Sequence, residues 1–226
     1  MSARKVAIVT GAGRGIGLAI AHALADVADL CLCARTASQL DEAARTLAGR
    51  TRVVPVLADV SAKADVERLV ATCVRELGGV DWLVNNAGVA EIASLGDTTD
   101  EQWDRTIGVN LTGPFYMARA ALPALVKSRG RIVNVGSISG TLGTPRMSAY
   151  NASKWGVNGL TKAWAEELKP QGVMVSAVLP GSVDTEMLRK SGFPPDMTPD
   201  DIAKIVRFLC VEAPFAMTGS LVEAFA

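Results

Sequence analysis

Histidine is nearly missing from this chain of 226 residues, and several kinds of catalytic and metal site are excluded with it. The one histidine, His22, cannot form a histidine-based metal cluster, and it lies far from any turn that could hold a hydrolase nucleophile. The four cysteines, Cys31, Cys33, Cys73 and Cys210, lack the spacing of a zinc site. Cys31 and Cys33 point to the same face of one strand, which is poor geometry for a disulfide. We therefore interpret His22 as structural and the cysteines as small buried hydrophobic residues, and we expect no metal site.

An excess of charge of either sign is also absent. Lys and Arg together number 23, Asp and Glu together number 23, and no block of basic residues occurs. This balance does not favour binding to nucleic acid or to an anionic membrane. No stretch approaches the roughly 18 uninterrupted apolar residues of a membrane span, and residues 1–5 lead into an apolar run without the features of a signal peptide. We expect a cytoplasmic protein that binds neither nucleic acid nor membrane.

What the sequence does contain is a regular alternation of short apolar runs and helical patterns. The runs are nearly continuous, as in strands buried on both faces, and lie at 6–9, 30–34, 53–58, 82–85, 131–135 and 175–179, with a weaker one at 221–223. Helical patterns lie at about 15–27, 38–48, 64–77, 100–127, 149–169 and 199–212. The alternation predicts an α/β fold of the Rossmann type: a doubly wound, mostly parallel sheet of six or seven strands with helices on both faces. Repeats and linkers are lacking, so we expect residues 1–226 to form a single domain.

A glycine-rich turn follows the first predicted strand. Residues 10–17 read Thr-Gly-Ala-Gly-Arg-Gly-Ile-Gly, and a helical pattern begins there. Glycines let the backbone approach a pyrophosphate, and the helix presents free N–H groups to it. The spacing is Gly-x-x-x-Gly-x-Gly instead of the usual Gly-x-Gly-x-x-Gly, but the order of strand, turn and helix is met. We predict a dinucleotide site that includes Gly11, Gly15, Ile16 and Gly17.

Charge near the second strand indicates which dinucleotide is bound. An acidic residue at the end of that strand would favour NAD, but Ala34 stands there and Arg35 follows. Arg14 lies in the glycine-rich turn, and two guanidinium groups near the ribose can bind a 2′-phosphate. We therefore predict NADPH/NADP+, with NADH less favoured; the alternative is that both arginines are solvated surface residues. Asp59 and Val60, at the end of the third strand, are placed to contact the adenine.

Tyr150 and Lys154 are the candidates for acid–base chemistry. Residues four apart share a helix face, so the ammonium group can lie near the phenol and lower its pKa from about 10. A tyrosine tuned in this way can exchange a proton with an alcohol or a carbonyl near neutral pH. Ser137 lies thirteen residues upstream of Tyr150, with Ser139 as a rival nearby. Taken alone, the Tyr-x-x-x-Lys pair could equally be an exposed helix face.

The motifs in order resemble the short-chain dehydrogenase/reductase family in its compact single-domain form, including its 3-oxoacyl-(acyl-carrier-protein) reductases and carbonyl reductases. The resemblance covers about residues 4–222. It rests on the glycine-rich turn, Asp59-Val60, Asn85-Asn86-Ala87-Gly88, Val109-Asn110, Gly136-Ser137, Tyr150-Asn151-Ala152-Ser153-Lys154, and Pro180-Gly181 with Thr185. The combination is specific for the family but not for a substrate.

The resemblance implies a role for each matching residue. Ser137 would hold the substrate oxygen, Tyr150 would be the general acid in reduction and the general base in oxidation, and Lys154 would lower the Tyr150 pKa and bind the nicotinamide ribose. Asn110 would anchor a water that links Lys154 to solvent, although alone it could simply cap backbone groups. The residues implied to shape the cofactor site are Asn85, Asn86, Ala87 and Gly88 beside the fourth strand, and Pro180, Gly181, Val183 and Thr185 at the nicotinamide.

Two segments depart from the family pattern. The expected substrate lid, about 182–198, is short; it could leave an open cleft for a large or carrier-bound substrate, or mark relaxed specificity. The carboxyl-terminal Glu223 is followed by Ala-Phe-Ala instead of two glycines, which makes the usual tetramer less certain than a dimer through the two long helices. Trp155 and Trp164 could anchor such an interface, but core or surface positions are equally consistent.

The predicted function is NADPH-dependent reduction of a ketone, either a neutral carbonyl compound or a 3-oxoacyl substrate, to a secondary alcohol. The residues expected to border the cleft are mostly apolar, although Arg146 and Arg189 lie nearby. An NAD(P)-dependent alcohol dehydrogenase that works oxidatively would use the same residues. A third hypothesis is a catalytically silent, NADP-binding regulatory protein, which is disfavoured because Ser137, Tyr150 and Lys154 are all present. We expect a small-molecule substrate, free or carrier-bound, and a homodimer or homotetramer.

Overall fold

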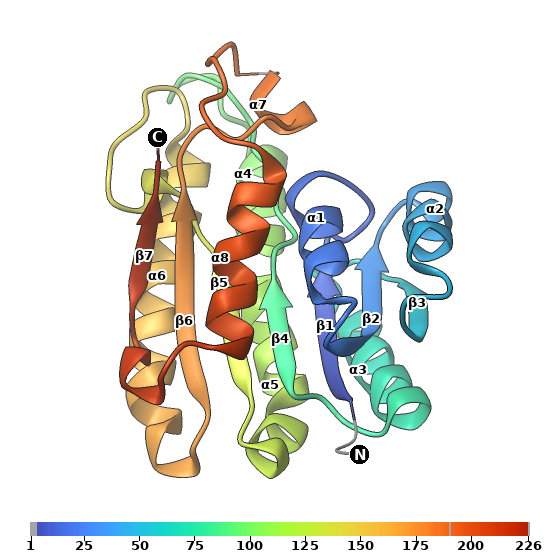
Figure 1. Cartoon of the computed structure of the whole chain (residues 1–226). Helices are drawn as coiled ribbons and strands as arrows, with labels where there is room; N and C mark the ends of the chain where they lie inside the picture. The colour runs from blue at the N-terminus through green and yellow to red at the C-terminus, as the bar shows by residue number, and fades with distance from the viewer. Residues whose placement is uncertain (1–3, 190, 226) are drawn as a thin grey trace.

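A single twisted sheet runs through the computed structural model, which describes residues 4–189 and 191–225 (Figure 1). Within these residues the sheet has seven strands in the order β3-β2-β1-β4-β5-β6-β7, and every neighbouring pair is parallel. The strands are β1 (Lys5–Thr10), β2 (Ala28–Ala34), β3 (Val53–Leu57), β4 (Trp82–Asn85), β5 (Arg131–Val135), β6 (Met174–Pro180) and β7 (Leu221–Ala224). The predicted Rossmann-type fold is confirmed, and the weak run at 221–223 is the seventh strand.

Helices cover both faces of the sheet and create two hydrophobic cores (Figure 1). One core lies under α1 (Gly15–Leu24), α2 (Ala37–Leu47) and α8 (Pro199–Val211); the other lies under α3 (Lys63–Leu77), α5 (Gly113–Ser128) and α6 (Ser148–Leu168). Successive residues of β1 alternate between them, with Ala7 and Val9 in the first core and Val6 and Ile8 in the second. Because the central strands are buried on both faces, they appear in the sequence as nearly continuous apolar runs.

Local sequence signals mark where several helices begin and end. Thr198 and Asp201 form a capping box at the start of α8, with Pro199 in the first turn. Thr99 and Gln102 form another at the start of α4 (Asp100–Ile107), and Gly78, whose φ of 92° favours glycine, caps the carboxyl end of α3. An amino-terminal cap such as Thr99 or Thr198 stabilises a helix by about 1 kcal/mol.

The pattern at 100–127, predicted as one helix, is divided into three parts. A π-helical segment, η1 (Gly108–Thr112), separates α4 from α5, and the amide of Gly113 bonds the carbonyl of Gly108 five residues back. Pro114 has no N–H to donate to the carbonyl of Asn110, four residues earlier, so regular α-helical bonding is interrupted there. Single π-helical turns of this kind often occur at functional sites.

The remaining sequence expectations concern isolated residues. All four cysteines are buried and free, as predicted. His22 contacts Thr46 and Arg50 at the surface of α1 and α2 and takes no part in the site described below. Among the described residues, none of the helices combines the length and apolar character that a membrane crossing requires.

Candidate active site

The predicted site residues meet at the carboxyl edge of the sheet, which is the upper edge in Figure 1. The strand order reverses between β1 and β4, and the crevice beyond such a switch point is the usual ligand site of this architecture. The turn after β1, the segments after β4 and β5, the start of α6 and the segment after β6 all lie there.

The glycine-rich turn has the conformation that an anion site needs. Gly11 and Gly15 have φ values of 66° and 53°. A Cβ on Gly17 would lie 2.2 Å from the Gly11 carbonyl oxygen, so only glycine fits there. The side chain of Arg14 does not cap α1, and the first turn of α1 contains no acidic residue, which leaves its N–H groups and positive dipole end available to a phosphate. The turn therefore fits the pyrophosphate of a dinucleotide.

Asn86 and Thr10 brace this turn from the neighbouring strand. Asn86 Nδ2 donates to the Thr10 carbonyl at 2.9 Å, and the amides of Asn86 and Ala87 both donate to Thr10 Oγ1 at 3.0 Å. The sequence suggested that Asn86 contacts the cofactor, and the structure adds that its side chain holds the turn. Asn85 points into the core, where its Nδ2 donates to Asn134 Oδ1 at 2.9 Å.

The end of the second strand carries an ion pair that the sequence did not suggest. Arg35 Nη1 lies 3.5 Å from Asp59 Oδ2, and Ser61 donates to Asp59 Oδ1 from both its amide and its hydroxyl. Burial alone would raise the pKa of Asp59, but the Ser61 hydrogen bonds and Arg35 outweigh it and the pKa is lowered. Val60 is buried, and its side chain packs close to Gly113.

Arg14 is also engaged with a carboxylate. Its guanidinium forms an ion pair with Glu186 on α7 (Glu186–Arg189), the four-residue helix in the predicted lid. Thr185 of the lid also lies near the turn, since a Cβ added on Gly15 would lie 3.5 Å from its methyl group. Sequence reasoning missed Glu186, since nothing in its neighbourhood relates it to residue 14.

Lys154 is almost fully buried beside Tyr150. Its Nζ donates to the Val135 carbonyl at 2.8 Å and lies 5.6 Å from the centre of the Tyr150 ring. Burial lowers the pKa of Lys154 to about 8. Burial raises the pKa of Tyr150, and a hydrogen bond with the Ser137 side chain offsets this only in part. The lowered Tyr150 pKa that we expected is therefore not found here, because burial outweighs the other influences and the ammonium group binds the Val135 carbonyl.

The structure distinguishes Ser137 from its rival. Ser137 follows β5 and its side chain lies near enough to Tyr150 to lower the pKa of the phenol, whereas Ser139 Oγ lies 3.2 Å from Thr144 Oγ1. The amide of Ser139 donates to Ser137 Oγ at 3.1 Å and fixes its orientation. The hydroxyl groups of Ser137 and Tyr150 therefore form a pair that can hold one oxygen atom of a substrate.

Asn110 joins three segments of the site. Its side chain accepts from the Val89 amide at 2.8 Å, donates to the Val89 carbonyl at 2.9 Å, and donates to Ser153 Oγ at 3.1 Å. A Cβ on Gly88 would lie 3.5 Å from Asn110 Oδ1 and 3.9 Å from Lys154 Nζ. The side chain thus holds the segment after β4 against α6.

The segment after β6 is supported by the carboxyl-terminal strand. The amide of Gly181 donates to the Ala224 carbonyl at 2.8 Å, and Pro180 is paired with Ala224 in the sheet. Val183 is buried and bridges to Met197 at the base of the lid, and Thr185 Oγ1 accepts from the Leu188 amide at 3.2 Å. The carboxyl-terminal strand β7 thus positions the predicted nicotinamide segment, a role that the sequence did not suggest.

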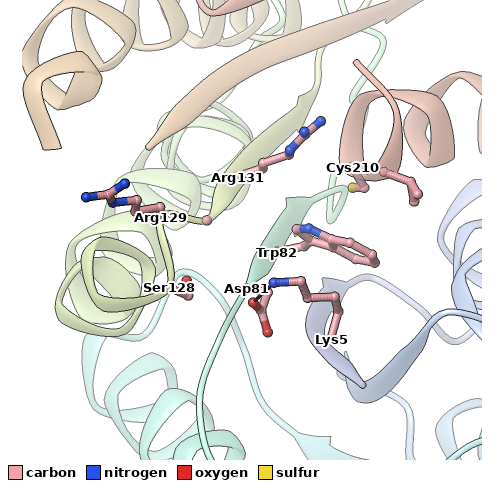
Figure 2. A pocket seen from close by; sticks show the side chains of 9 residues that line it. Lys5, Asp81, Trp82, Ser128, Arg129, Arg131 and Cys210 are labelled. Atoms are coloured by element: carbon pink, nitrogen blue, oxygen red, sulfur yellow. Dashed lines mark hydrogen bonds and ion pairs between the residues drawn. The ribbon is translucent and has the colours of Figure 1, made fainter. Parts of the chain in front are cut away.

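A separate cavity lies at the opposite edge of the sheet, where β1, β4 and β5 begin (Figure 2). It has a volume of about 180 Å³, and Lys5, Asp81, Trp82 and Arg131 are among its lining residues. Lys5 pairs with Asp81 at 2.7 Å, and Arg131 donates to the Leu209 carbonyl at 2.7 Å. In Figure 2 the Arg129 side chain points away from these groups. The charged groups of this cavity therefore join the starts of β1 and β4 to each other and the start of β5 to α8, and they do not converge on a common point.

Comparison with known proteins agrees with this geometry. The family model for short chain dehydrogenases matches residues 5–193. The chain is 33% identical to the 3-oxoacyl-(acyl-carrier-protein) reductase FabG of Thermotoga maritima, over 96% of this chain and 95% of the relative. It is 36% identical to the trans-4-hydroxycyclohexanecarboxylate dehydrogenase of Sinomonas cyclohexanicum, over 96% and 90%. A Sinorhizobium meliloti structure described as a short-chain alcohol dehydrogenase superposes with a TM-score of 0.90 at 33% identity, over 97% of this chain and 94% of that one. The chain belongs to the short-chain dehydrogenase/reductase family and is an oxidoreductase of that family.

Proposed function

We propose that this protein reduces a ketone to a secondary alcohol with NADPH. The observation that carries the proposal is the Ser137–Tyr150 hydroxyl pair beside the buried Lys154, at the same sheet edge as the glycine-rich turn. When bound, the nicotinamide supplies the hydride. Negative charge then develops on the substrate oxygen, where the two hydroxyl groups can donate hydrogen bonds.

In this proposal Tyr150 gives a proton to the developing alkoxide. Lys154 lies beside Tyr150, and a proton from solvent at the edge of the site can replace the lost one through water. Asn110 would anchor such a water, since Pro114 has no N–H to donate to its carbonyl. Ser137 holds the substrate oxygen, with its own orientation fixed by the Ser139 amide.

The preference for NADPH rests on Arg14 and Arg35. Both guanidinium groups lie at the edge that holds the glycine-rich turn, and both are half-exposed. A 2′-phosphate can accept charge-assisted hydrogen bonds from either group. NADH lacks this phosphate and is the less favoured cofactor.

The substrate we propose is a neutral, largely apolar ketone or a 3-oxoacyl compound, free or bound to a carrier. Exposed apolar side chains lie on the loops around the crevice, at Ile92, Leu95, Leu142, Met187 and Phe193. The Ala93 amide donates to the Arg146 carbonyl at 3.0 Å, which joins two of these loops. Arg189 is paired with Asp184 at 3.0 Å and is not aimed at a substrate charge. A reductase of 3-oxoacyl substrates among the relatives agrees with this substrate class.

Oxidation of an alcohol is the second candidate, because one relative is a hydroxycyclohexanecarboxylate dehydrogenase and the same residues serve both directions. Tyr150 would then accept the proton that it donates in reduction. A silent binding protein is the weaker alternative, since Ser137, Tyr150 and Lys154 lie together.

We also propose that residues 1–226 act as one catalytic domain and assemble as a homodimer through α5 and α6. A groove of about 480 Å³ runs along these helices, lined by apolar residues and glycines that include Leu111, Phe115, Gly156 and Leu160. Trp155, which is 56% exposed, could anchor the partner, whereas Trp164 packs against the core. Cytoplasmic localisation stays a prediction from the sequence.

The test is nucleotide oxidation by the purified protein with NADPH or NADH and a panel of aliphatic, aromatic and cyclic ketones and 3-oxoacyl thioesters. Tyr150→Phe should abolish turnover while NADPH binding, measured by calorimetry, stays nearly unchanged. Appreciable turnover by Tyr150→Phe would refute its role as the proton donor. If wild-type protein turns over no ketone but oxidises alcohols with NADP+, the oxidative candidate replaces the reductase.

A further inference from the structure

The lid presents a carboxylate to the same guanidinium that the proposed cofactor needs. Arg14 lies immediately before α1, within the glycine-rich turn, and it pairs with Glu186. The two side chains are about half-exposed, at 55% and 50%. Thr185 lies near Gly15, where an added Cβ would meet its methyl group at 3.5 Å, so a second residue places the lid beside the turn.

Arg35 also has a carboxylate partner, but the two pairs are built differently. Asp59 is fixed in place by two hydrogen bonds from Ser61, at 2.9 and 2.7 Å. Glu186 lies instead on a four-residue helix within the lid, whose base is held by the bridge between Val183 and Met197. A phosphate that approaches Arg14 therefore meets the Glu186 carboxylate, which is part of the lid, whereas one that approaches Arg35 meets Asp59 in the segment after β3.

We propose that Glu186 is a specificity-determining residue that competes with the 2′-phosphate of NADPH for Arg14. Arg14 must exchange the carboxylate for the phosphate, whereas a cofactor without a 2′-phosphate leaves the ion pair intact. Glu186 thus reduces the preference for NADPH that Arg14 and Arg35 create. The inference rests on the proposed use of NADPH.

The experiment measures the affinity of Glu186→Gln for nucleotide fragments by calorimetry at low ionic strength. Adenosine 2′,5′-bisphosphate carries the 2′-phosphate, and 5′-AMP lacks it. Loss of an exposed charge pair is worth a few-fold in affinity, so the bisphosphate should bind about two- to fivefold more tightly to the variant, with 5′-AMP nearly unchanged. Asp184→Asn is the matched control, because it removes a lid carboxylate that pairs with Arg189 and not with the turn.

A double-mutant cycle with Arg14→Gln identifies the route of the effect. In the Arg14→Gln background, Glu186→Gln should no longer strengthen binding of the bisphosphate. Equal strengthening in both backgrounds, equal strengthening for 5′-AMP, or no strengthening at all would overturn the inference. Wild-type protein that binds the bisphosphate no better than 5′-AMP would overturn the NADPH assignment and the inference together. If the wild type prefers the bisphosphate but Glu186→Gln leaves this preference unchanged, only the role of Glu186 fails.

Discussion

Replacing Lys154 by methionine should stabilise the protein while removing its activity. Lys154 is 4% exposed, and burial lowers its pKa from 10.5 to about 8. At 1.36 kcal/mol for each pKa unit, keeping this ammonium group charged in the fold costs about 3 kcal/mol near pH 7. Methionine removes the buried charge and fills a similar volume, but it leaves the Val135 carbonyl without its donor, which costs about 1 kcal/mol.

The net gain for Lys154→Met is therefore about 2 kcal/mol, or a rise in Tm of about 4–8 °C for a chain of this size. The sign of the pH dependence follows from the lowered pKa. Below about pH 8 Lys154 is charged in both the folded and the unfolded protein, so its burial cost is fully present. Between about pH 8 and 10.5 only the unfolded state binds the proton, and the wild type recovers stability.

Calorimetry of both proteins between pH 7 and 9.5, without added nucleotide, measures this difference. The advantage of Lys154→Met should be largest at pH 7 and shrink as the pH rises through 8. Lys162→Met, on the exposed side of α6, is the control and should show no such trend. A variant less stable than the wild type at pH 7, or an advantage independent of pH, would refute the argument that the buried charge opposes folding.

Other predictions address the turn, the cofactor and the interface. Gly17→Ala should raise the Kd for NADPH more than about tenfold, because its Cβ would lie 2.2 Å from the Gly11 carbonyl oxygen and displace the turn. Gly79 has open space around it, so Gly79→Ala should bind NADPH normally in the same titration. Arg35→Asp should weaken NADPH by at least about tenfold and NADH much less, and equal losses measured by calorimetry would exclude a role for Arg35 in reading the 2′-phosphate. Trp155→Glu should convert the dimer to a monomer in light scattering, whereas Phe208→Glu on the opposite face of the sheet should not.

Much of the architecture is visible in the sequence because its causes are local. A strand buried on both faces is apolar at most positions, so the central strands appear in the sequence as separate apolar runs. The helix starts at Thr99 and Thr198 carry their own capping signals. The division of residues 100–128 into α4, η1 and α5 was missed, although Pro114, four residues after Asn110, was an available signal.

The sequence by itself determined the family and the parallel sheet and supplied the candidate residues for the chemistry, because each of these depends on residue type and on spacing along the chain. Tertiary structure alone decided how those residues are engaged. Contacts between distant segments pair Arg14 with Glu186, join Asn110 to Ser153, and place Ala224 against Gly181. The direction of the Tyr150 pKa is also a tertiary property. The spacing of Tyr150 and Lys154 predicted a cation near the phenol. The pKa of the phenol also depends on how deeply it is buried, and burial is set by the whole fold.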